Sequence, residues 1–85
     1  MTASLLEEIL NIIEAHTELI DRLECQAIMH SLQIQELKGK LKIPSSLWVL
    51  YANAMLESDK QFRTEFRRKV RELLKKYRMV HLEHI

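Results

Sequence analysis

The fold is decided by residues 5–38, LLEEILNIIEAHTELIDRLECQAIMHSLQIQELK, which contain neither glycine nor proline. Apolar side chains fill most of the a and d positions of a heptad repeat that starts at Leu6. The ten positions of this stripe are Leu6, Ile9, Ile13, His16, Ile20, Leu23, Ala27, His30, Ile34 and Leu37. The period predicts one long helix that buries the stripe in the core or against a second copy of the chain.

A second apolar group lies on the other side of the same helix. It consists of Cys25, Ile28, Met29 and Leu32, which are three or four residues apart. A helix that is apolar nearly all round is usually buried on two sides. The C-terminal helices or a second subunit would provide that cover, and the alternative is an exposed patch that binds a protein partner. We take these four residues as the candidate partner face.

Helix ends can be placed from the turn residues. Gly39 suits the left-handed end of a helix, and Pro44 suits the first turn of the next one. Capping-box patterns begin at Ser4 and at Ser58. The expected elements are a helix over residues 5–38, a turn over 39–44, a helix over 46–57 and a helix over 59–83. Whether the last two are separate or one kinked helix stays open.

The fold class that follows is all-α, with the long N-terminal helix folded against one or two C-terminal helices. The stretch Leu47–Leu56 is so apolar that we expect it to be the hub of the core. A chain of 85 residues buries little surface alone, and dimerisation into a helical bundle is a common remedy. The sequence does not distinguish a parallel from an antiparallel dimer.

Charge is divided unevenly along the chain. Residues 1–37 contain seven acidic residues and one basic residue, whereas residues 59–78 contain nine basic and three acidic residues. A basic helix can bind a nucleic acid through its phosphates, although charge runs are more often solvated helix faces. The candidate nucleic-acid contacts are Arg63, Arg67, Arg68, Arg71 and Lys75.

Catalytic chemistry has no support in the sequence. It contains no glycine-rich phosphate loop, no paired-cysteine motif and no metal-binding histidine motif, so we expect no catalytic, cofactor or metal site and no small-molecule substrate. The single cysteine, Cys25, favours a reducing compartment, and no stretch is apolar enough for a membrane span. We therefore expect a cytoplasmic protein with no membrane partner.

These features predict a non-enzymatic helical adaptor or regulator that acts as a homodimer and binds a protein partner. The alternative is a regulatory protein that binds nucleic acid through its basic C-terminal helix.

Overall fold

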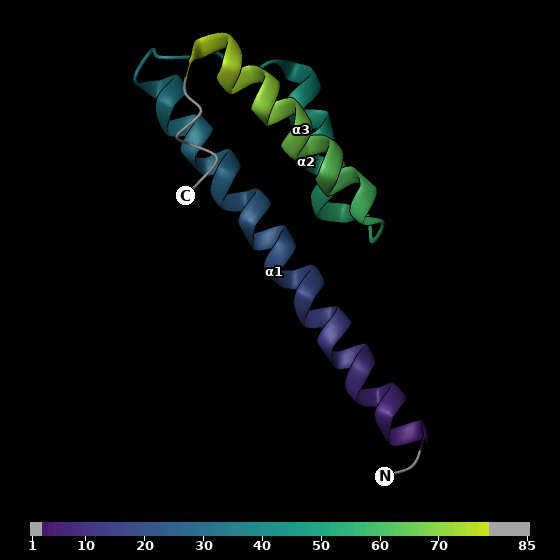
Figure 1. Cartoon of the computed structure of the whole chain (residues 1–85). Coiled ribbons are helices and arrows are strands. Elements are labelled where there is room, and N and C mark those ends of the chain that lie inside the picture. The colour runs from purple at the N-terminus through teal and green to yellow at the C-terminus, as the bar shows by residue number, and fades with distance from the viewer. Residues whose placement is uncertain (1–2, 79–85) are drawn as a thin grey trace.

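Three helices make up the part of the chain that the computed structural model describes, residues 3–78 (Figure 1). They are α1 (Ala3–Leu37), α2 (Ser45–Leu56) and α3 (Lys60–Tyr77). The last two are therefore separate helices, because the chain leaves helical geometry at residues 57–59. Residues 79–83 of the expected third helix lie outside the described residues.

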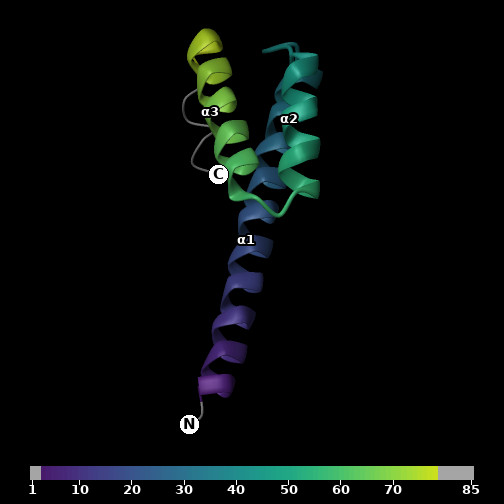
Figure 2. The same cartoon turned by 90° about the vertical axis from the view of Figure 1, so that its right-hand side faces the viewer.

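The three helices lie alongside one another over only half the length of α1. From the end of α1, α2 runs back along it, and α3 then turns and runs in the direction of α1 again (Figures 1 and 2). The first half of α1 projects beyond both of them, which gives the molecule dimensions of 56 × 22 × 18 Å. We call residues 3–20 of α1 the arm, and residues 21–78 the body.

The core lies entirely within the body, where α2 and α3 are packed together and against α1. Helix α3 provides the largest share through Phe66, Val70, Leu73 and Leu74. The other buried apolar residues are Cys25, Met29, Leu32, Leu41, Ile43, Leu47 and Ala54. Helix α1 thus enters the core through residues of the candidate partner face.

The heptad stripe of α1 does not enter this core, so its proposed role there is corrected. At about 100° per residue, Cys25, Met29 and Leu32 lie on the side of α1 opposite the stripe. A helix in a three-helix body has one side to bury, and here the stripe is on the other side. All ten stripe residues are exposed in the single chain.

The connection from α1 to α2 lies over the side of α1 that is covered. Gly39 has φ 73°, as predicted, and the amides of Gly39 and Lys40 donate to the carbonyls of Glu36 and Gln35, both at 2.9 Å. This pattern is a Schellman motif, which reverses the chain. The Glu36 carboxylate then accepts a hydrogen bond of 2.7 Å from the amide of Ile43. Since Glu36 follows Leu32 by four residues, this bond holds the connection over the core side of α1.

The helix caps differ in detail from those predicted. Helix α1 already includes Ser4, so this residue is not its cap. At the start of α3 the cap is Asp59 rather than Ser58, and its carboxylate accepts a hydrogen bond of 2.9 Å from the amide of Gln61. Pro44 precedes α2 without a side-chain cap. Asp and Ser both cap well, so composition alone does not choose between adjacent candidates.

Helix α2 is less buried than its composition suggested, which corrects its role as the hub. Only Leu47 and Ala54 are buried, while Trp48, Val49 and Leu56 are exposed. Tyr51 lies between, with its ring 5.5 Å from that of Phe66. The helix packs on α1 and α3 with one side only, so the apolar residues on its other side face solvent in the single chain.

Candidate interaction surface on helix α1

The stripe forms an exposed apolar surface along α1. Its aliphatic members from Leu6 to Ile34 are 38–57% exposed, and Leu37 is 89% exposed. The stripe follows the whole of α1, roughly 50 Å at 1.5 Å per residue, along both arm and body. Soluble monomers rarely expose an apolar surface of this extent, so the stripe is the candidate interaction surface.

On the arm the apolar surface is wider than the stripe. Further exposed aliphatic residues flank it on both sides, namely Leu5, Leu10, Ile12 and Leu19. By helical geometry they widen the apolar surface to about half of the circumference of the helix. An apolar face this wide suits a helix with two neighbours rather than one.

The remaining side of the arm is acidic. Glu7, Glu14 and Glu18 lie on the side of α1 that, further along, carries Cys25, Met29 and Leu32. This side therefore changes from acidic to apolar at about Asp21. Helices α2 and α3 cover only the apolar portion, which explains why the arm stands free of them.

Asp21 marks the junction and is bound by two arginines of α3. Its carboxylate pairs with Arg63 Nε and, at 2.5 Å, with Arg67 Nη1, while Arg67 Nη2 lies 2.9 Å from Glu24 Oε2. Arg63 is only 2% exposed and also donates to the carbonyl of Glu57 at 3.3 Å. From the other edge of α1, Arg22 donates to the same carbonyl at 3.1 Å. These bonds fix the turn between α2 and α3 against the middle of α1.

The pKa of Asp21 is shifted by this environment. Partial burial alone raises the pKa of the carboxyl, but the hydrogen bonds and charges of Arg63 and Arg67 outweigh it and hold the pKa below its ordinary value. Asp21 is therefore a carboxylate at neutral pH, as the buried guanidinium of Arg63 requires.

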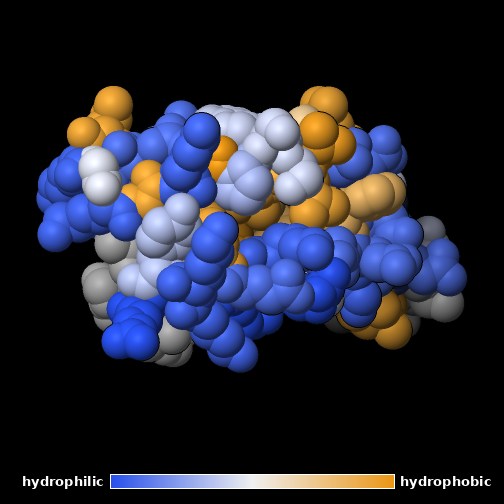
Figure 3. Space-filling view, turned by 90° about the horizontal axis from the view of Figure 1, so that it is seen from above, coloured by the Kyte–Doolittle hydropathy of each residue, from blue (hydrophilic) through white to orange (hydrophobic). Residues whose placement is uncertain are grey.

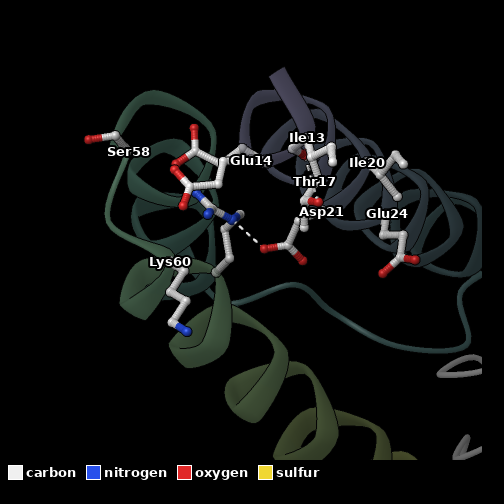
Figure 4. A pocket seen from close by; sticks show the side chains of 10 residues that line it. Ile13, Glu14, Thr17, Ile20, Asp21, Glu24, Ser58 and Lys60 are labelled. Carbon is white, nitrogen blue, oxygen red and sulfur yellow. Dashed lines mark hydrogen bonds and ion pairs between the residues drawn. The ribbon is translucent and has the colours of Figure 1, made fainter. Parts of the chain in front are cut away.

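An open notch of about 560 Å³ lies at the angle between the arm and the turn from α2 to α3 (Figure 4). One wall is formed by α1, and the other contains Ser58 and Lys60 together with Arg63. Asp21 of α1 and Arg63 of α3 form an ion pair across the notch. This ion pair joins the two walls, and the other charged residues that line the notch are Glu14, Glu18, Glu24 and Lys60.

The prediction that the candidate partner face binds another protein is corrected by this geometry. Cys25, Met29 and Leu32 are fully buried within the chain, and Ile28 packs against the core, so a partner cannot reach this face while the body is folded. Burial raises the pKa of the Cys25 thiol. A protonated, buried thiol is a poor nucleophile, which fits a structural role for this residue.

The candidate nucleic-acid contacts do not form one free basic surface. Arg63 is buried and Arg67 is bound to Asp21 and Glu24, so for these two the prediction is corrected by the contacts with α1. Arg68 pairs with Glu65 and Glu72 of its own helix. Arg71 and Lys75 are exposed on α3. The sequence showed the basic run but not which of its members α1 would neutralise.

Seen from the end of the body at which α1 and α3 end, the surface is mostly hydrophilic, with apolar side chains among the hydrophilic ones (Figure 3). Lys38, Lys40 and Lys42 lie in the connection there and are exposed, as are Lys75 and Lys76 at the end of α3. Positive charge thus gathers at the opposite end of the molecule from the acidic arm.

Among residues 3–78, no group of three or more potential ligands is placed to hold a metal ion. None of the helices described is long and apolar enough to cross a membrane. Comparisons of the chain with protein-family models, with curated proteins and with solved structures gave no significant match.

Proposed function

We propose that this chain is a helical protein–protein interaction module that forms a homodimer through the stripe of α1. The observation that carries the proposal is the exposure of this stripe along all of α1, on the side opposite the core. The buried surface of a small body is limited, and pairing would cover the apolar residues that the single chain leaves in water. A non-enzymatic adaptor or regulator in the cytoplasm is the role that fits these features.

Charge reversal within the stripe tests the proposal. The side chains of Ile13 and Ile20 are 53% and 57% exposed, so replacing either with glutamate leaves the core of the single chain untouched. Light scattering of the native chain should give twice the 10.1 kDa chain mass, and Ile13→Glu or Ile20→Glu should give the single mass. A native chain that is monomeric at tens of micromolar would refute the dimer.

A matched control separates the stripe from the arm in general. Asn11 is exposed on the acidic side of the arm, so Asn11→Glu adds the same charge away from the stripe. We expect this variant to remain dimeric. If Asn11→Glu dissociates the dimer as fully as Ile13→Glu does, the interface does not lie on the stripe.

Binding to nucleic acid is the weaker alternative, because Arg63, Arg67 and Arg68 are paired with acidic residues of α1 and α3. Gel-shift assays at low and high salt test it directly. Retardation that weakens with salt and is lost in Arg71→Glu/Lys75→Glu would support this alternative.

A further inference from the structure

We propose that the two copies pair antiparallel through α1, with residue i of one copy opposite residue 43 − i of the other. This inference rests on the proposed function and specifies its geometry. The partner that covers the stripe is then a second copy of this chain, in one orientation and one register.

The register follows from the spacing of the stripe. In an antiparallel pair of heptad helices, an a residue faces a d residue, and their residue numbers add to a constant. For this chain that sum is 36, 43 or 50, and only 43 gives all ten stripe residues a partner within α1. The opposed pairs are Leu6 with Leu37, Ile9 with Ile34, Ile13 with His30, His16 with Ala27, and Ile20 with Leu23.

The sizes of the opposed side chains favour this arrangement over a parallel one. At this register the imidazole of His16 lies across from Ala27, the smallest residue of the stripe, and His30 lies across from Ile13. In a parallel pair in register, each histidine would meet its own copy and Ala27 would face Ala27. Two polar layers and one underfilled layer are a poorer core than mixed layers of large and small residues.

Charge favours the same orientation. The arm contains four acidic residues and no basic residue, whereas the body contains thirteen basic and seven acidic residues. Antiparallel pairing sets the acidic arm of one copy alongside the body of the other, which carries a net positive charge. Parallel pairing would put the two acidic arms together, and like charges at short range repel.

The position of the body also fits a second copy. Helix α2 is tied to one edge of α1 by the bond from Arg22 to Glu57, and α3 is tied to the other by the Arg67 pairs with Asp21 and Glu24. Both lie on the side opposite the stripe, so neither helix blocks the approach of a second α1 to the stripe. Gln26 and Gln33 lie on the edge of α1 that faces α2.

Contact with that edge would account for the extra width of the apolar surface on the arm. In the antiparallel pair, Ile12 and Leu19 of one arm come next to the α2 edge of the other copy, whose Trp48, Val49 and Leu56 are exposed. Each arm would then have two neighbours, α1 and α2 of the second copy. Each end of the dimer becomes a four-helix arrangement made of one arm and one body.

The available area is sufficient for a stable pair. The stripe side chains, most of them about half exposed, offer roughly 1,000 Å² per copy, compared with about 800 Å² per partner in a typical stable complex. The stripe alone therefore exposes about as much surface as each partner buries in a typical stable complex.

Disulfide cross-linking tests orientation and register together. Ile9 and Ile34 are exposed in the single chain, so Ile9→Cys and Ile34→Cys leave the core intact, and Cys25 stays fully buried in both. The two variants carry tags of different size and are gently oxidised, each alone and after mixing. The native chain, treated in the same way, measures any linking through Cys25. We expect the mixture to form a cross-linked heterodimer, in a yield several-fold above the yield of cross-linked dimer from either variant alone. Mixing Ile9→Cys with Leu23→Cys, which lies out of register, should give no such product.

Other outcomes are decisive in different ways. If Ile9→Cys cross-links to itself, the pair is parallel, and this inference fails while the homodimer stands. If light scattering shows a dimer but the Ile9 and Ile34 variants do not link, the register is wrong. If the native chain is monomeric, the proposed function itself fails.

Discussion

At the scale of single residues, Asp21 determines where the body ends. It is the last acidic residue before α1 becomes apolar on its core side, and it binds both Arg63 and Arg67. Arg63 has few alternatives, because it is almost completely buried and its other bond is to the carbonyl of Glu57. A buried guanidinium without its carboxylate is costly, so this pair sets the position of the α2–α3 turn along α1.

Replacing Asp21 with asparagine tests this role. Asp21→Asn leaves the buried Arg63 without its anionic partner, and we expect the free energy of unfolding to fall by about 2–4 kcal/mol. Urea denaturation followed by circular dichroism measures the loss. Glu14→Gln, which removes an exposed carboxylate from the same notch, should change it by less than about 0.5 kcal/mol. Equal effects of the two substitutions would contradict the role of Asp21.

The lowered pKa of Asp21 predicts how stability depends on pH. An unfolded aspartate titrates near about 3.9, and in the folded chain the pKa is lower because Arg63 and Arg67 stabilise the anion. The contribution of the pair is therefore present above pH ~4 and is lost as pH falls through the folded pKa. Denaturation at several pH values below 5 should show the native chain losing more stability than Asp21→Asn does. Parallel curves for the two proteins would argue against it.

Residue-level prediction from the sequence was uneven, for physical reasons. The left-handed turn at Gly39 was predictable, because few other residue types adopt positive φ without strain. The buried state of Arg63 was not, because arginine is usually exposed and its neutralisation depends on a residue 42 positions away. Local backbone geometry could be predicted from the sequence, whereas pairing between residues far apart in the chain could not.

At the scale of elements, the existence of α1 was predictable but its buried side was not. The sequence offers two apolar sides, and the longer one, the stripe, is the stronger signal. In the folded chain the connection lies over the shorter side, where the Glu36 carboxylate accepts a hydrogen bond from the amide of Ile43. A single side-chain-to-backbone bond of this kind leaves no periodic pattern in a sequence.

The connection after α1 gives a prediction at this scale. At Gly39 an added Cβ would meet no atom within 4 Å, so the cost of Gly39→Ala comes from the positive φ alone. We expect a loss of about 1 kcal/mol in unfolding free energy, and a change below about 0.5 kcal/mol for Lys38→Ala. Denaturant titration of both variants measures this difference. No loss in Gly39→Ala would mean that the turn does not need left-handed geometry.

Removing the arm separates folding from assembly. All residues of the core lie at Cys25 or beyond, so a chain that begins at Glu18 retains the whole core. We expect it to unfold cooperatively, with a stability close to that of monomeric Ile13→Glu, and to be monomeric by light scattering. Non-cooperative unfolding of the shortened chain would show that the arm is needed for the fold.

At the scale of the whole molecule, the acidic arm and basic body predict the effect of salt on assembly. In the antiparallel pair each arm lies beside the oppositely charged body, so screening removes an attraction. Raising salt from about 0.02 M to about 0.5 M should increase the dissociation constant several-fold, as measured by fluorescence anisotropy of a labelled chain. In a parallel pair the acidic arms repel, and salt would strengthen binding instead.

The freedom of the arm from α2 and α3 has a consequence for partner choice. Seven residues inserted within the arm would keep the stripe in phase and leave the body unchanged. Two lengthened chains would still match each other end to end, but a lengthened chain and a native one would leave apolar turns uncovered. On the proposed pairing, the number of heptads in the arm works as a length code, by which a chain recognises copies of itself among similar helices.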